Sequence, residues 1–99
     1  MPLSKKPFDL AEYLTDPADQ SELLSDAFAS GDPAYIANAL GTIARARGMT
    51  ETAKLAGVTR EGLYKALRKT GDPRLSTLLG VTEALGYRLT VTPVVPKVG

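Results

Sequence analysis

An Asp-Pro dipeptide occurs twice in the first half of this chain, at residues 16–17 and 32–33. The Asp side chain can accept hydrogen bonds from the unpaired amides at the start of a helix, and Pro suits the first helical position. Each pair precedes apolar residues at helical spacing and then a glycine, Gly31 or Gly48, that can end the helix. The pattern predicts two consecutive helices that begin at these pairs and end at these glycines.

The segment between residues 49 and 69 predicts two further, shorter helices separated by a turn. Thr50 can cap a helix that runs through Ala56, and Gly57 can take the left-handed conformation that ends it. Thr59 can cap the next helix, which we expect to continue to about Lys69. Two short helices around a glycine turn are typical of a helix-turn-helix motif.

The last third of the chain predicts one more helix and a strand. After a break at residues 71–73, a further apolar pattern predicts a fifth helix that Gly86 closes. Tyr87, Leu89 and Val91 then alternate with polar residues, which predicts a short β-strand. A solitary strand leaves its backbone groups unpaired, so we expect a homodimer in which these three residues contact a second copy. A strand packed on its own domain, or a frayed tail, is the alternative.

These elements define an all-α fold of about five short helices with a central helix-turn-helix, plus the C-terminal strand. With 99 residues, the chain is long enough for one compact core. We divide it into an N-terminal arm (residues 1–15), a helical domain (16–86) that contains the motif (49–69), and a strand and tail (87–99). The sequence has no long apolar tract, no signal-peptide pattern and no cysteine, so we expect a cytoplasmic protein that does not enter a membrane.

Opposite charges divide the chain into two parts. Residues 1–44 carry seven acidic side chains against two lysines, a net charge of −5, whereas residues 45–74 carry eight basic against three acidic side chains, a net charge of +5. The first part should repel nucleic acid and the second should attract it. Because the chain has no His and no Cys, it lacks the commonest general base and the thiol nucleophile. With no carboxylate pair suited to acid–base work, we expect no catalysis, no metal and no cofactor.

The motif at residues 49–69 has a side suited to packing and a side suited to DNA. Ala53, Val58, Leu63 and Ala66 are small or apolar and can pack the two helices against the core. The outward side chains are charged or form hydrogen bonds, as contacts to base edges and phosphates in the major groove require. These candidate DNA-binding residues are Thr50, Thr59, Arg60, Glu61, Tyr64, Lys65 and Arg68.

Two roles can be distinguished among these outward residues. Arg60 is the best candidate for a bidentate contact to guanine, and Glu61 can accept from cytosine or orient Arg60. The other side chains suit contacts to phosphates, which fix the register on the duplex: Lys65, Arg68, Tyr64 and Thr50. The alternative is that this basic helix face is only a solvated surface.

Three stretches resemble a known family: FDLAEYL near the start, GDPAYIANALGTIARARGMT in the middle and GVTREGLYKALRKTGDPRLSTLLGVTEALGYRL near the end. They resemble the addiction-module antidote proteins, a HigA-like branch of the xenobiotic-response-element, lambda-repressor-like helix-turn-helix group. The resemblance implies a bacterial antitoxin that neutralises a RelE/HigB-like toxin, typically an mRNA-cleaving ribonuclease, and represses its own operon. It places the outward residues from Thr59 to Arg68 on recognition-helix positions. Two departures are Arg74, where related domains often have a Ser or Thr cap, and Thr52, at a usually apolar position.

No short motif marks a toxin-binding surface. The acidic first half can face a basic toxin, since complementary potentials speed encounter. These candidate residues are Asp9, Glu12, Asp16, Asp19, Glu22 and Asp26. Alternatively, they only start helices or face solvent.

The expected partners are therefore double-stranded DNA, with an inverted-repeat operator read by a homodimer, and a RelE/HigB-like toxin. A stand-alone transcriptional regulator of the same fold, of phage origin or not and without a toxin, is the main competing hypothesis. A small nuclease would need metal-gathering carboxylates or an activated nucleophile, which the sequence does not show. A helical adaptor would show no salt-dependent affinity for DNA.

Overall fold

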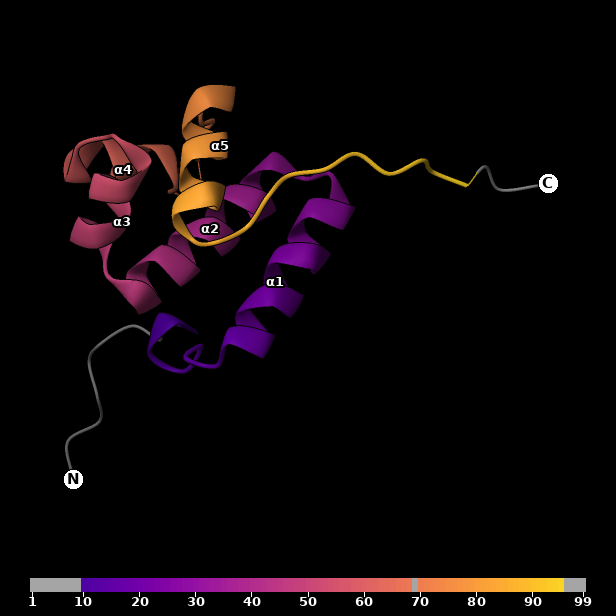
Figure 1. Ribbon diagram of the computed structural model, residues 1–99, viewed down its shortest axis with the longest axis horizontal. Helices are drawn as coiled ribbons and strands as arrows, with labels where there is room; N and C mark the ends of the chain where they lie inside the picture. Colours follow the sequence, from indigo (N-terminus) through magenta and orange to yellow (C-terminus); the bar gives the residue numbers. More distant parts are fainter. Residues whose placement is uncertain (1–9, 69, 96–99) are drawn as a thin grey trace.

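The computed structural model describes residues 10–68 and 70–95, and these residues form an all-helical fold (Figure 1). All five expected α-helices are present, and a short 3-10 helix precedes them. None of the described helices is long and apolar enough to cross a membrane. The elements are η1 (Leu10–Glu12), α1 (Pro17–Ser30), α2 (Pro33–Arg47), α3 (Met49–Ala56), α4 (Arg60–Ala66) and α5 (Leu75–Ala84).

The starts of α1 and α2 follow from their Asp-Pro pairs, as predicted. Asp16 Oδ1 accepts a hydrogen bond from the amide of Ala18 at 2.9 Å, and Asp32 Oδ1 accepts one from the amide of Ala34 at 3.0 Å. Gly31 ends α1 in the left-handed conformation, with a φ of 69° that a side chain would disfavour. Local sequence therefore specifies both helices.

The start of α3 differs from the prediction, because Thr50 does not cap it. The N-cap is Gly48, which makes no side-chain hydrogen bond, and Met49 is the first helical residue. Met49 is buried in the core, so packing draws the chain into helix immediately after Gly48. The buried hydroxyl of Thr52 donates to the Gly48 carbonyl at 2.8 Å, which satisfies a polar side chain at this usually apolar position.

Helix α4 is shorter than expected, since it ends at Ala66, while Lys69 lies outside the described residues. Leu67 follows as the C-cap, with its amide donating to the Leu63 carbonyl at 3.0 Å, and its side chain is buried. A Cβ atom at Gly41 of α2 would lie 2.8 Å from the Leu67 carbonyl oxygen. The end of α4 therefore packs directly on the α2 backbone.

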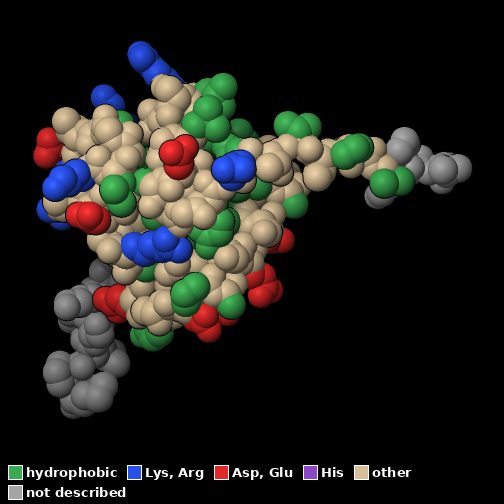
Figure 2. Space-filling view, viewed as in Figure 1, with side chains coloured by type: hydrophobic (Ala, Val, Ile, Leu, Met, Phe, Trp, Pro, Cys, Tyr) green, Lys and Arg blue, Asp and Glu red, His purple; other side chains and the backbone are tan. Residues whose placement is uncertain are grey.

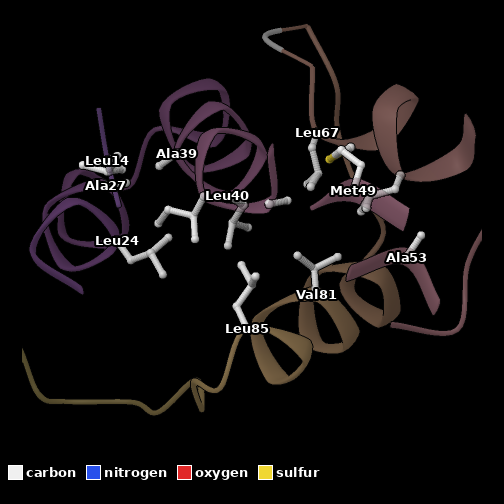
Figure 3. Packing of buried hydrophobic residues seen from close by; sticks show 13 residues of the cluster. Leu14, Leu24, Ala27, Ala39, Leu40, Met49, Ala53, Leu67, Val81 and Leu85 are labelled. Carbon is white, nitrogen blue, oxygen red and sulfur yellow. The ribbon is translucent and has the colours of Figure 1, made fainter. Parts of the chain in front are cut away.

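The core lies around α2, which contacts η1, α1 and α3, while α3 also contacts α4 and α5. Leu40 and Ile43 of α2 are fully buried, together with Leu63 of α4 and Val81 of α5. Figure 3 shows Leu40 and Leu85 near the centre of this cluster, with Leu24 on the α1 side and Val81 towards α3. A single core thus joins the first helices to the helix-turn-helix.

The predicted C-terminal strand is wrong for the described part of the chain, where residues 87–95 form no strand. Within one chain, no neighbouring strand is available to form a ladder with this segment. The half-buried Tyr87 instead packs against the chain's own core, with its hydroxyl 2.8 Å from Ser21 Oγ of α1. Beyond it, Leu89 is half-buried, Val91 is 97% exposed, and the segment extends away from the helices (Figure 1).

Candidate nucleic-acid interface

Helices α3 and α4 are joined by a tight turn with the properties the motif requires. Gly57 has a φ of 74°, and its amide donates to the Lys54 carbonyl at 3.2 Å. The amide of Val58 donates to the Ala53 carbonyl at 3.0 Å, which closes the turn. Because Ala53 and Leu63 are buried, the two helices are held against the core and the opposite side of α4 faces outward.

The structure brings most of the candidate DNA-binding residues together on the outward side of α4. Thr59 is its N-cap, with Oγ1 accepting a hydrogen bond from the Gly62 amide at 3.0 Å. The remaining members recur at helical spacing and are all exposed: Arg60, Glu61, Tyr64, Lys65 and, just beyond the end of the helix, Arg68. Thr50 is exposed on α3. We call this surface the candidate α4 face, and it is accessible to a ligand. Its residues are Thr59, Arg60, Glu61, Tyr64, Lys65 and Arg68.

Arg60 is oriented by its neighbour one turn later. Its Nη2 atom lies 3.5 Å from the hydroxyl of Tyr64, and its Cζ atom lies 5.6 Å from the centre of the tyrosine ring. The hydrogen bond with Tyr64 raises the pKa of Arg60 above its ordinary value. An arginine side chain is charged at physiological pH in any case. A stacked, charged guanidinium keeps several donors available for a planar acceptor such as the edge of guanine.

Charge is distributed unevenly over the surface. Figure 2 shows Lys and Arg side chains mainly on the side where α3 and α4 lie, where some acidic side chains also occur, and acidic side chains along the edge of α1. Helix α1 contains Asp19, Glu22 and Asp26 and no basic residue. Sequence reasoning did not single out Lys54, which is exposed on α3 next to the turn. Its position within the basic stretch of residues 45–74 could have identified it as a candidate DNA-binding residue.

Arg47 belongs to the same basic stretch, but the structure gives it a structural role. Its Nε donates to Gln20 Oε1 at 2.9 Å, and its Nη1 donates to the Leu85 carbonyl at 2.6 Å. Its guanidinium also lies 5.8 Å from the centre of the Tyr87 ring. These contacts join the end of α2 to α1 and to the chain after α5. No local signal could have identified them, because the partners lie far away in sequence.

The six candidate toxin-binding acids differ in the contacts that they make. Asp9 lies outside the described residues, and Asp16 caps α1. Asp26 accepts a hydrogen bond from the hydroxyl of Tyr35 at 2.5 Å, which joins α1 to α2. The remaining three are exposed: Glu12 of η1, and Asp19 and Glu22 of α1. Among residues 10–68 and 70–95, no group of three or more Asp and Glu side chains could hold a metal ion.

Comparison with known proteins identifies the family. A family model described as "Probable addiction module antidote protein" matches residues 4–93. A protein of Haemophilus influenzae (strain Rd), named "Uncharacterized protein", is 43% identical over 86 residues, which cover 87% of this chain and 89% of that protein. No solved structure matches. An antidote acts against a toxin, so this match implies an antitoxin role and a toxin partner of some kind. With nearly its whole length covered, the chain belongs to the family of addiction module antidote proteins.

Proposed function

We propose that this protein is the antitoxin of a type II toxin-antitoxin module, which neutralises a RelE/HigB-like toxin and represses its own operon by sequence-specific DNA binding. The toxin half of the proposal rests on membership of the antidote family. The DNA half rests on one observation: the α3–turn–α4 unit packs its apolar side on the core and leaves a basic, hydrogen-bonding face exposed. We propose that it acts in the cytoplasm, without metal or cofactor.

In this proposal α4 enters the major groove. Arg60, held over Tyr64, donates to the O6 and N7 atoms of a guanine, and Glu61 accepts from a cytosine or fixes the position of Arg60. Thr59 serves chiefly as the helix cap, because its Oγ1 already accepts from the Gly62 amide. The exposed side chains that remain contact phosphates and set the register: Thr50, Tyr64, Lys65 and Arg68.

We further propose that the protein reads its operator as a homodimer, because a two-fold protein pair matches an inverted repeat. The side chain of Tyr87 is committed to its own chain, through Ser21 and the Arg47 guanidinium. Leu89 is half-buried, whereas Val91 is 97% exposed. Of the three expected contact residues, Val91 therefore remains as the candidate for contact with a second copy. Sedimentation of the protein at micromolar concentration, compared with a Val91→Asp variant, tests this contact.

Binding to the promoter fragment of the protein's own operon tests the DNA half. We expect affinity to fall steeply with salt, because each neutralised phosphate releases counterions. Arg60→Ala should lower affinity for the promoter by about 1–3 kcal/mol and leave random DNA nearly unaffected. Lys65→Ala should weaken both and reduce the salt dependence. Arg88→Ala, which removes one exposed charge outside α4, is the matched control and should bind as the wild type does.

The opposite pattern would contradict the assignment. If Arg60→Ala weakened both DNAs equally and Lys65→Ala removed only sequence preference, the roles on the α4 face would be reversed. Co-expression with the product of the neighbouring open reading frame tests the toxin half, with growth rescue and co-purification as readouts. A harmless neighbour that does not co-purify would favour a stand-alone transcriptional regulator.

A further inference from the structure

A groove runs between the second half of α1 and the chain after α5. Its apolar side chains include Leu24 and Phe28 of α1 and Leu89 of the C-terminal segment. Ser25 and Ala29 are small and exposed along the same side of α1, so they leave the groove open. Among the described residues that line it, Arg88 is the only charged one. The groove is thus a largely uncharged depression that apolar side chains of a partner could fill.

The chain segment that forms the C-terminal wall of this groove has backbone groups and apolar side chains that could contact a partner. The amide of Tyr87 donates to the Thr82 carbonyl at 2.9 Å, and in the described chain no backbone–backbone hydrogen bond involves residues 88–95. Three aliphatic side chains project from this segment and are more than four-fifths exposed: Val91, Val94 and Val95. Exposed apolar side chains continuous with a groove are typical of a surface that a partner covers.

An acidic row follows the other wall. Glu22 lies three residues before Ser25 and seven before Ala29, so it stands at the edge of the groove on α1. Asp19 and Asp26 lie three residues before and four residues after Glu22, which places all three carboxylates in one row. Like charges at these spacings destabilise an isolated helix, and α1 has no basic residue to offset them. A basic partner would relieve this repulsion.

The groove and the candidate α4 face lie on different parts of the molecule. Figure 1 shows α4 at one side, whereas α1 and the extended C-terminal segment lie towards the other. Figure 3, from a different direction, again separates α1 from the region of Met49 and Ala53 on α3. A protein seated in the groove would therefore leave α4 accessible to DNA.

We propose that this groove is the toxin-docking site: a basic toxin places apolar side chains between α1 and residues 87–90 and sets its Lys or Arg side chains against Asp19, Glu22 and Asp26. The proposal rests on the antitoxin function proposed above and names the surface that performs it. Complementary charge selects the partner and speeds encounter, while burial of the apolar side chains holds the complex. The same molecule binds toxin and operator DNA together, because the two surfaces are separate.

The test uses the full-length chain and the product of the neighbouring open reading frame, with affinity measured by calorimetry or surface plasmon resonance. Ser25→Trp fills the groove without changing charge, and Glu22→Lys reverses one charge at its edge. Each should weaken the complex by at least about tenfold, the size of effect that central interface residues typically show. Ser76→Trp and Glu83→Lys, exposed on α5, are matched controls and should stay within about twofold of the wild type.

DNA binding provides a second readout. The promoter affinity of Ser25→Trp should stay within about twofold of the wild type, since groove and α4 are separate, and this also shows that the variant is folded. Glu22→Lys changes an exposed helix residue and keeps the test decisive if Ser25→Trp fails to fold. A ternary complex of promoter fragment, antitoxin and neighbour product should be detectable by gel shift.

Three outcomes would contradict the proposals, and each contradicts a different one. If the wild type binds the neighbour product and both groove variants bind it equally well, the groove assignment is wrong and the antitoxin function stands. If the wild type neither binds nor neutralises it, the proposed function itself fails. If Ser25→Trp dissociates a homodimer in sedimentation while toxin affinity is unchanged, a second copy occupies the groove instead of the toxin.

Discussion

Helices α1 and α2 differ from α3 and α4 in what holds them in place. The first pair has 14 and 15 residues, and each helix begins with an Asp side chain bonded to its own first turn. The second pair has only 8 and 7 residues, and α3 has no side-chain cap. Isolated helices of that length are marginal in water, so tertiary packing must supply most of their stability. The first pair is specified locally, and the second depends on the first.

The two pairs of helices also carry different proposed functions. The locally specified α1 carries the acidic row and one wall of the groove, whereas the packing-dependent α4 carries the candidate DNA face. Two features connect the first pair to the rest of the fold. One is the shared core around Leu40, and the other is the Arg47 contact with Leu85 at the end of α5, a helix that in turn packs on α3. Substitutions at these connections, and then within each pair alone, test whether α3 and α4 depend on α1 and α2 for their stability.

The largest effect should come from Leu40→Ala, which removes a fully buried side chain from the core that both pairs share. Such a cavity costs about 2–5 kcal/mol of the free energy of unfolding. Denaturant unfolding followed by circular dichroism should show one transition at a lower midpoint. Leu79→Ala, at a leucine that is 45% exposed, is the control and should cost about 0.5 kcal/mol. Separate transitions for the two pairs would contradict a common core.

The next effect should come from Arg47→Met, which keeps an apolar stem and removes the guanidinium. The Leu85 carbonyl and the buried Gln20 side chain would each lose a charged donor, at a cost of about 1.5–3 kcal/mol. We expect faster amide hydrogen exchange in α5 and in α3 than in α1. Equal acceleration in all helices would show that Arg47 does not connect α2 to α5 and, through α5, to α3. Arg88→Met, outside this network, is the control.

The same contrast explains what the sequence could predict. The helices α1 and α2, with their Asp caps at Asp16 and Asp32, were predictable because residues two positions apart determine them. The glycine turn and the α4 face were predictable from residue type and spacing, since Gly57 takes the expected left-handed conformation and Thr59 caps α4.

The predictions from sequence failed where contacts between residues far apart in the chain determine the structure. Thr50 is a reasonable cap by type, but burial of Met49 starts the helix two residues earlier, with Gly48 as the N-cap. Alternation over Tyr87, Leu89 and Val91 is typical of a strand, yet Tyr87 turns inward to Ser21, 66 positions away. Likewise, no spacing rule brings Arg47 to Gln20, or α1 and the C-terminal segment to one groove. Such contacts are set by the packed fold.

A smaller effect, confined to the helix-turn-helix, should come from Gly57→Ala. Nothing lies within 4 Å of a Cβ atom there, so the cost is the left-handed conformation alone, about 1–2 kcal/mol. Gly57→Asn should lose less, because Asn tolerates this conformation. We expect promoter affinity to fall and the affinity for the neighbour product to remain, as measured on the same preparations. Equal loss of both affinities would show that the groove depends on the turn.

The smallest effect concerns the first pair alone and depends on pH. The hydrogen bond from Tyr35 to Asp26, burial, and the negative charge of Asp26 raise the pKa of Tyr35 above its ordinary value of 10.0. A raised pKa means that the folded state holds the proton more tightly, so this stabilisation is complete below pH 10 and is lost as pH rises through the folded-state pKa. Asp26→Asn should lower the Tyr35 pKa in a tyrosinate absorbance titration, with Tyr35→Phe identifying the signal. A titration unchanged by Asp26→Asn would show that this contact does not join α1 to α2 in solution.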